Sequence, residues 1–302
     1  MNKFIIKVPA TSANLGPGFD ALGLALNLWN VTEFTQAESF SLHIDGEGSD
    51  RLAPNEKNLI YRSAQKLYET VNRKIPPLSI HCSNQIPLAS GLGSSAAAIL
   101  TGILGANALL GSALTHEEIL CLATEIEGHP DNIAPGLLGG LVVSTIENGT
   151  VISRQLPITP VHITVVTPEF NFPTAQARAV LPKQVSLKDA IHNISRAVLV
   201  TEAFRTGDLG LLGQAMSDTL HQPYRLPLIP GAQAAMEAGK KAGASAVALS
   251  GAGPSLIAFS LEHDPGIGLA MKQTFVSVGL SARVFELGVS HLGARVDNGK
   301  LP

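Results

Sequence analysis

The chain has 302 residues, of which 45% are apolar and 15% are charged, with a formal net charge of −3. This composition fills one large or two smaller cores, and the scattered Lys and Arg form no basic stripe, which predicts neither nucleic acid nor a membrane as a partner. No stretch has the pattern of a signal peptide or of a spanning helix, so we expect a cytoplasmic protein.

The predicted elements of the first half are mostly strands joined by short turns, followed by helices. Short turns favour antiparallel pairing. A capping box from Thr115 to Glu118 marks the start of one helix, and Asn148-Gly149 marks a hairpin turn. In chain order we expect strands at 4–8, 22–29, 31–35, 40–44 and 78–83, helices at 58–71, 95–110 and 115–128, and strands at 139–145 and 151–156.

Two prolines in the segment 157–160 mark the expected domain boundary, which divides the chain into 1–157 and 158–302. Helices and partly antiparallel sheets in two blocks predict an α+β fold. In the second half we expect strands at 161–167, 245–249, 255–261 and 282–287, and helices at 186–206, 208–221, 231–243 and 265–278.

The most informative motif is the glycine-rich segment 87–97, which leads directly into a long uncharged apolar run. A glycine-rich turn at a helix N-terminus presents free N–H groups to an anion, and Gly91 and Gly93 let the chain approach a phosphate closely. A Walker A loop would need a lysine, and a dinucleotide fingerprint would follow a strand immediately. The protein-kinase loop would need His-Arg-Asp and Asp-Phe-Gly partners, which the sequence lacks. A loop that only caps a buried helix is the alternative.

Three more polar motifs are candidates for chemistry. Segment 9–20 holds Asn14 and Asp20, segment 125–132 holds Glu125 as a candidate Mg²⁺ ligand, and segment 250–255 is a second glycine turn. Turn chemistry, an exposed helix end and a plain β-turn are their respective structural alternatives. Arg178 and Arg225 suit a carboxylate or a phosphate, although a lone arginine is often a surface charge.

In this order and spacing, the motifs resemble the GHMP kinases, the superfamily of galactokinase, homoserine kinase, mevalonate kinase and phosphomevalonate kinase. The resemblance extends over about residues 7–284, and the opening motif and the Pro-Tyr-Arg segment 223–225 are most similar to homoserine kinases. It implies an N-terminal domain like ribosomal protein S5 domain 2 and a ferredoxin-like C-terminal domain, with the active site between them. It further implies transfer of the γ-phosphoryl group of ATP to the hydroxyl of L-homoserine, in threonine biosynthesis, with Mg²⁺ as cofactor and a possible homodimer.

The resemblance also implies roles for individual residues. Ser95 and Glu125 are the expected Mg²⁺ ligands. The expected catalytic residues are Asn14, Asn132 and Arg178. Residues expected to bind homoserine are Asn14, Asp20, His129, Asn132, Thr174, Arg178 and Arg225. Residues expected to bind ATP are Pro87, Leu88, Ala89, Ser90, Gly91, Leu92, Gly93, Ser94, Ser95, Ala96, Ala97, Gly251 and Gly253.

One departure from other superfamily members concerns the base. Mevalonate kinase and galactokinase have an aspartate where this sequence has Asn132, and an amide cannot accept a proton. Phosphoryl transfer depends mainly on positioning and charge neutralisation, so Asn132 and Asn14 are expected to align the hydroxyl without a strong base. Asp131 as the base is the alternative. A kinase for mevalonate or a sugar, and an inactive member that only binds or regulates, are the competing functions.

Overall fold

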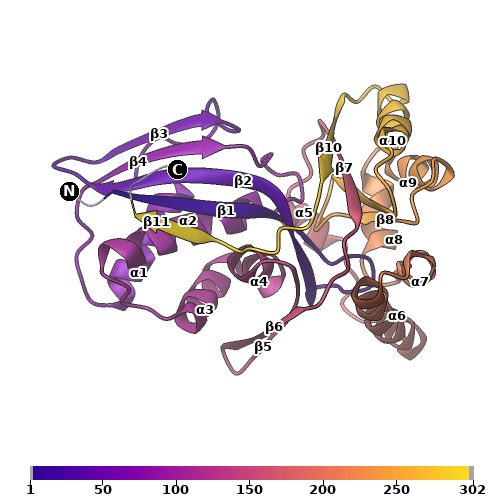
Figure 1. The fold of residues 1–302 in the computed structure, drawn as a ribbon, viewed down its shortest axis with the longest axis horizontal. Coiled ribbons are helices and arrows are strands. Elements are labelled where there is room, and N and C mark those ends of the chain that lie inside the picture. Colours follow the sequence, from indigo (N-terminus) through magenta and orange to yellow (C-terminus); the bar gives the residue numbers. More distant parts are fainter. Residues whose placement is uncertain (1–2, 299–302) are drawn as a thin grey trace.

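The computed structural model describes residues 3–298 and contains two β-sheets with helices packed against them (Figure 1). The larger sheet has seven strands and runs in the order β11-β1-β2-β4-β3, with the hairpin β5–β6 attached to β2. Among the described strands of this sheet, β3 and β4 alone pair in parallel. The strands are β1 (Lys3–Ala13), β2 (Leu22–Gln36), β3 (Ser41–Gly46), β4 (Leu78–Asn84), β5 (Leu141–Glu147), β6 (Thr150–Leu156) and β11 (Arg295–Asn298).

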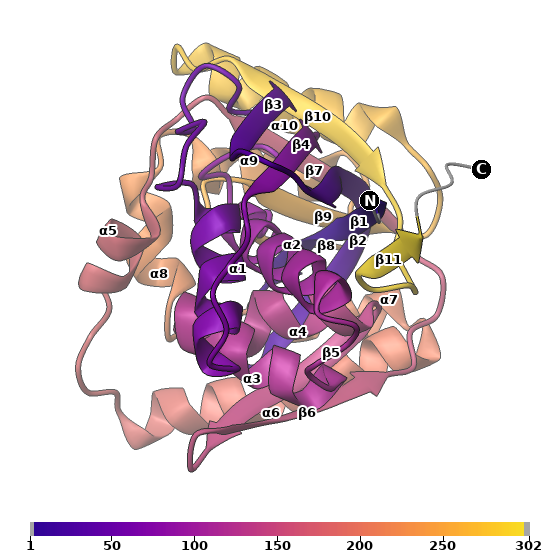
Figure 2. The same cartoon turned by 90° about the vertical axis from the view of Figure 1, so that its left-hand side faces the viewer.

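Four helices gather on one side of this sheet (Figures 1 and 2). They are α1 (Leu59–Thr70), α2 (Ser94–Leu109), α3 (His116–Glu127) and α4 (Pro130–Leu138). Helix α2 carries no charge and is buried on nearly every side, as an apolar run of this length predicts. Gly102 lets α1 approach, because a side-chain carbon there would lie 2.1 Å from the carbonyl oxygen of Ile60.

The smaller sheet is fully antiparallel in the order β10-β7-β9-β8. With helices between β7 and β8 and between β9 and β10, it has the ferredoxin-like β-α-β-β-α-β topology. Its strands are β7 (His162–Pro168), β8 (Ala246–Leu249), β9 (Leu256–Ser260) and β10 (Ala282–Leu287). The helices of this half are α5 (Thr174–Ala179), α6 (Leu187–Thr206), α7 (Leu209–Ala215), α8 (Gln222–Arg225), α9 (Ala232–Lys241) and α10 (Pro265–Ser277), and a 3₁₀ turn spans Leu226–Leu228.

The α+β class, the capping box and the hairpin are as predicted. The side chain of Thr115 accepts the N–H of Glu118 in the capping box, and Asn148 and Gly149 both have positive φ in the turn between β5 and β6. Within residues 3–298, no helix combines the length and apolarity needed to cross a membrane.

Three predicted elements, two strands and one helix, differ from the structure. The strands 22–29 and 31–35 form one strand, β2, because Asn30 makes no turn there: its Oδ1 accepts the N–H groups of Gln85 and Ile86. The helix 208–221 ends at Ala215, because the Asp218 carboxylate accepts three backbone N–H groups and begins a new turn.

The division into 1–157 and 158–302 places the last strand in the wrong half. Strand β11 pairs antiparallel with β1, so the end of the described chain returns to the first sheet, as the yellow strand beside β1 in Figure 1 shows. The chain therefore crosses between the two sheets twice, first between β6 and β7 and again between β10 and β11. Elements that the sequence analysis missed are α4, α5, α8 and β11.

Candidate active site

A cavity of about 530 Å³ lies where the two halves of the chain meet. It is lined by the glycine-rich loop, by the segment joining α3 to α4, by α5 and α8, and by the turn between β8 and β9. The predicted homoserine residues that line it are Asn14, His129, Asn132, Thr174, Arg178 and Arg225. One cavity thus brings together motifs from distant parts of the sequence.

The glycine-rich loop ends at the N-terminus of α2. Gly93 is the N-cap residue with φ of 70°, and no side chain caps the helix. The first-turn N–H groups are therefore available to an anion. A side-chain carbon on Gly93 would lie 2.0 Å from Oγ1 of Thr11, so only glycine fits this approach.

Residues of the loop divide between the cavity and the core. Those that line the cavity are Leu88, Ala89, Ser90, Gly91, Gly93, Ser94 and Ser95. Four others in the predicted ATP set are buried and do not line it: Pro87, Leu92, Ala96 and Ala97.

The second glycine turn closes against this loop. The hydroxyl of Ser250 donates to the carbonyl of Gly91 at 2.7 Å, and the N–H of Gly251 donates to the carbonyl of Ala13 at 3.0 Å. Gly251 lines the cavity. Gly253 does not, because a side-chain carbon there would meet Ile229 and Leu249 instead.

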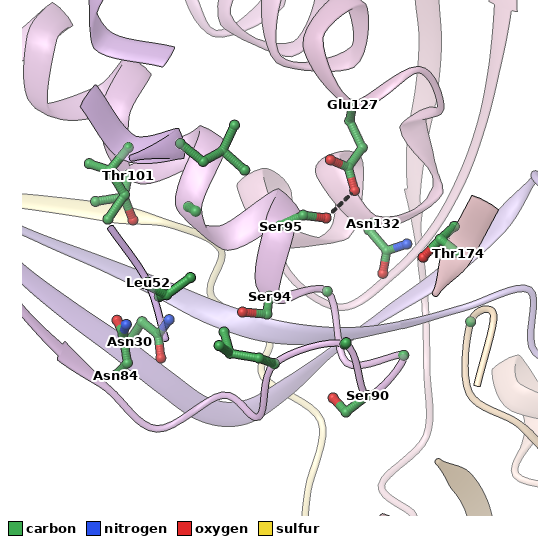
Figure 3. A pocket seen from close by; sticks show the side chains of 18 of the residues that line it. Asn30, Leu52, Asn84, Ser90, Ser94, Ser95, Thr101, Glu127, Asn132 and Thr174 are labelled. Carbon is green, nitrogen blue, oxygen red and sulfur yellow. Dashed lines mark hydrogen bonds between the residues drawn. The ribbon is translucent and has the colours of Figure 1, made fainter. Parts of the chain in front are cut away.

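The predicted metal pair is wrong in one member. The Ser95 hydroxyl donates a 2.5 Å hydrogen bond to Oε1 of Glu127, which lines the cavity (Figure 3). Glu125 is exposed and pairs with Lys66 at 3.0 Å, outside this cavity. Residues two apart on a helix differ by about 200°, so the two carboxylates leave α3 on opposite faces.

The pair of Ser95 and Glu127 is suited to a magnesium ion. A hydroxyl and a carboxylate are the hard oxygen donors that Mg²⁺ prefers. Burial raises the pKa of Glu127 above that of an ordinary glutamate, while the hydrogen bond from Ser95 opposes this effect. A partly buried carboxylate of this kind is stabilised by a bound cation.

The polar side chains of His129, Asp131 and Asn132 lie together at the start of α4. Nδ1 of His129 lies 2.6 Å from Oδ1 of Asp131, and Oγ1 of Thr11 donates to Oδ1 of Asn132 at 2.8 Å. Because Thr11 occupies Oδ1, and Nδ2 of Asn132 uses one N–H in a long 3.4 Å hydrogen bond to Oδ1 of Asp131, the second N–H of Nδ2 is the donor left for a ligand. Burial alone would lower the pKa of His129, but the hydrogen bond and charge of Asp131 outweigh it and raise that pKa.

Arg178 and Asp20 form a bidentate pair. The two guanidinium nitrogens donate to the two carboxylate oxygens at 2.8 and 3.1 Å. Asp20 itself is not in the cavity wall. Its N–H donates to Oδ1 of Asn14, whose Nδ2 donates to the carbonyl of Gly251, so Asn14 ties the opening loop to the second glycine turn.

Arg225 is a buried cation at the cavity wall. Its side chain is among the largest that are fully buried, with the residue 1% exposed. Its Nε donates to the carbonyl of Ala177 at 3.1 Å, and Nη1 lies 3.3 Å from both Nδ1 of His221 and the carbonyl of Gly251. Among residues 3–298, no carboxylate lies within 4.0 Å of it. Burial, followed by the charge of Arg178, lowers the pKa of Arg225 to about 10.

His221 holds Arg225 against the opening loop and was missed by the sequence analysis. Its Nε2 donates to the carbonyl of Gly16 at 2.7 Å, so Nδ1 accepts from Arg225 and the ring is neutral. Burial lowers the pKa of His221, in agreement with this state. The ring of Phe19 stacks on His221 with centroids 5.3 Å apart and lies 5.2 Å from Cζ of Arg225.

A second lobe of the cavity extends between β2, β4 and α1, and no motif in the sequence indicated it. Half of its lining residues are apolar, and the others carry amides, hydroxyls or, at Arg51 and Lys57, a positive charge; Figure 3 shows Leu52, Asn30, Asn84 and Thr101 there. Apolar surface combined with a few placed polar groups is typical of a small-molecule site. The lobe is lined by Asn30, Thr32, Ile44, Arg51, Leu52, Ala53, Lys57, Asn58, Leu59, Ile60, Cys82, Asn84, Ala98 and Thr101.

The sequence matches two protein-family models. The family model described as "GHMP kinases N terminal domain" matches residues 58–140, and the one described as "GHMP kinases C terminal" matches residues 200–276. A homoserine kinase of Moorella thermoacetica is 47% identical over 97% of this chain and 99% of its own, and one of Carboxydothermus hydrogenoformans is 42% identical over 96% and 95%.

Solved structures agree with these matches. A homoserine kinase from Cytophaga hutchinsonii superimposes with a TM-score of 0.87 at 31% identity, covering 98% of both chains. The L. major mevalonate kinase, at 16% identity and a TM-score of 0.70, shares the fold. The chain therefore belongs to the GHMP kinases, and among them to the homoserine kinase family.

Proposed function

We propose that this chain transfers the γ-phosphoryl group of ATP to the side-chain hydroxyl of L-homoserine, giving O-phospho-L-homoserine for threonine biosynthesis. The choice of homoserine as the acceptor rests mainly on Arg225. Its guanidinium group is buried in the cavity wall, and among the described residues no carboxylate lies within 4.0 Å of it. A buried charge needs a partner, and the carboxylate of an amino acid supplies one. Homoserine also has an ammonium group, which mevalonate lacks. Asp20 is the candidate partner of that group, although it lies outside the cavity wall and its carboxylate is already paired with Arg178.

ATP fits the other end of the cavity. The uncapped first turn of α2 and the glycine loop receive its phosphates, and the second lobe, with both apolar and polar side chains in its wall, receives its nucleoside. Ser95 and Glu127 would hold Mg²⁺, which neutralises phosphate charge when bound. This assignment replaces Glu125 with Glu127 and keeps Ser95.

Positioning, rather than a strong base, is the chain's main contribution to the reaction. Nδ2 of Asn132 points to the acceptor hydroxyl or the phosphate, because Thr11 occupies its Oδ1. The hydroxyl oxygen forms a bond to the γ-phosphorus, the bond to the β–γ bridging oxygen breaks, and ADP leaves. The hydroxyl proton passes late to the transferred phosphate. Asp131 remains the alternative acceptor, although its Oδ1 is already engaged by His129.

One assay distinguishes the candidate functions. ATP consumption is measured with homoserine, with mevalonate, with galactose and without acceptor. Turnover only with homoserine supports the proposal, preferential turnover of mevalonate or galactose would replace the acceptor, and no turnover with any of them would point to a binding or regulatory protein. We further propose that the protein is cytoplasmic, forms a homodimer, and binds neither nucleic acid nor a membrane. Sedimentation of the purified chain tests the dimer.

A further inference from the structure

A cluster of three metal-ligating side chains lies outside the cavity, on the exposed face of strands β3 and β4. His43 and Asp45 are two residues apart on β3, and successive strand residues alternate between faces, so both point the same way. His81 is paired with His43 across the parallel ladder and is also exposed. Their neighbours along the strands, Ile44 on β3 and Cys82 on β4, face the opposite side and line the cavity.

The ligand atoms of the three side chains converge. Nε2 of His81 lies 2.7 Å from Oδ2 of Asp45, and Nε2 of His43 lies 3.1 Å from Oδ1 of the same carboxylate. All three ligand atoms lie within 4.8 Å of one another. Ligand atoms of a tetrahedral zinc site, with bonds of about 2.0–2.2 Å, are about 3.3 Å apart, so small rotations of exposed side chains reach this arrangement.

We propose that His43, Asp45 and His81 form a binding site for a zinc-like divalent transition metal, with water in the fourth coordination position. Two imidazole nitrogens and one carboxylate oxygen are a donor set that suits Zn²⁺ and Co²⁺. Mg²⁺ prefers oxygen donors alone, so the magnesium needed by a kinase does not compete for this site. The alternative is a solvated cluster in which each histidine merely hydrogen-bonds to Asp45.

The chain contains a natural control for this alternative. His162 and His263 also face each other, but their ring centroids are 6.2 Å apart, against 5.0 Å for His43 and His81. The nearby Glu286 is 3.8 Å from His263 and accepts a hydrogen bond from Thr164 at 2.8 Å. The second cluster thus also contains two histidines and a carboxylate, but their ligand atoms do not converge. It should therefore bind zinc much more weakly than the cluster of His43, Asp45 and His81.

A metal held here would join the edge strand β3 to β4 on the outside of the cavity wall. β3 is the last strand of its sheet and pairs only with β4 among the described strands. A ligand that binds only the folded ladder stabilises it in proportion to its concentration and affinity. Zinc should therefore slow local opening of β3, which amide hydrogen exchange measures.

The test is a zinc titration of the purified chain against a chromogenic chelator, repeated with Co²⁺ to record its visible spectrum. We expect one site in the wild type that survives millimolar Mg²⁺, and at least about tenfold weaker binding in each of His43→Gln, His81→Gln and Asp45→Asn. His162→Gln should bind as the wild type does. Zinc that binds in the ATP cavity instead would bind with the same affinity in all of these variants, so it would not produce this difference in affinity.

Hydrogen exchange supplies the second readout. Zinc should slow exchange of the β3–β4 amides in the wild type and leave it unchanged in His81→Gln. The substituted side chains are exposed, so the variants are expected to fold, and circular dichroism checks this. The proposal is overturned if His43→Gln and His81→Gln bind zinc with wild-type affinity, or if His162→Gln loses as much affinity as they do.

Discussion

The hydroxyl of Ser95, in the first turn of α2, donates a 2.5 Å hydrogen bond to Glu127, in the last turn of α3. This contact places one hydroxyl and one carboxylate together where the glycine-rich loop presents its N–H groups. Glu125, on the other face of α3, pairs with Lys66 instead. The two glutamates therefore form a matched pair for testing the metal assignment.

Glu127→Gln should greatly reduce turnover, whereas Glu125→Gln should leave it nearly unchanged. The amide keeps the size of Glu127 but removes the charge that Mg²⁺ needs, and Glu125 loses only an exposed ion pair of little energy. The measurement is turnover as a function of Mg²⁺ concentration for both variants. Equal losses, or near-normal turnover of Glu127→Gln at ordinary magnesium, would remove Glu127 from the metal site.

Gly93→Ala should abolish nucleotide binding, and Gly111→Ala is its control. Both glycines have positive φ, 70° and 76°, so both variants bear a backbone strain of about 1–2 kcal/mol. Only at Gly93 would the new carbon also collide with Thr11, since no atom lies within 4 Å at Gly111. Titration with a non-hydrolysable ATP analogue measures the difference. Comparable affinity in the two variants would mean that the loop only caps α2.

His221→Phe should raise the KM for homoserine about tenfold and leave ATP affinity unchanged. The ring would still stack on Phe19, but Arg225 would lose the acceptor at Nδ1, and a hydrogen bond to a charged group is worth roughly 1.5–3 kcal/mol. KM is measured for each substrate while the other is saturating. An equal loss for ATP would show a general defect in folding rather than a change in the position of Arg225.

Two histidines should give stability contributions of opposite pH dependence. The pKa of His129 is raised in the folded state, so its contribution is complete below the unfolded value of about 6.5 and is lost as pH rises through the folded pKa. The pKa of His221 is lowered, so its contribution is complete above about 6.5 and declines as pH falls below that value. Urea unfolding of His129→Gln and His221→Phe against wild type should show gaps that change with pH in opposite directions; parallel changes would contradict the assigned charge states.

Most of the regular elements, though not α4, α5, α8 and β11, were predictable from local sequence patterns. The uncharged run of α2, the capping box of α3 and the Asn-Gly hairpin are each encoded by neighbouring residues. Pairing between distant segments was not: β11 returns to β1 across the whole chain length, and Asn30 stays within a strand because it binds backbone 55 residues away. Helix α4 was missed because its prolines and glycine suggest a loop.

Much of the site was predictable because its motifs are rich in glycine and polar residues. The sequence could have favoured Glu127 over Glu125 as the metal ligand. Leu120, Ala123 and Glu127 follow one another at helical spacing and so share one face of α3, and Leu120 and Ala123 are buried. The second lobe of the cavity and His221 had no such signal. Their roles arise from side chains on separate elements that meet only after folding, such as His221 with Gly16, 205 residues apart.

The central claim is that the cavity recognises an amino acid through its charged groups. The most direct measurement compares kcat/KM for homoserine and for 1,4-butanediol, which keeps a primary hydroxyl but lacks both charged groups. We expect the wild type to prefer homoserine by far more than tenfold, because each charge-assisted bond contributes roughly 1.5–3 kcal/mol. The preference should shrink in Arg178→Leu, because the half-buried guanidinium that this variant removes lines the cavity. Equal use of the two acceptors by the wild type would contradict the account.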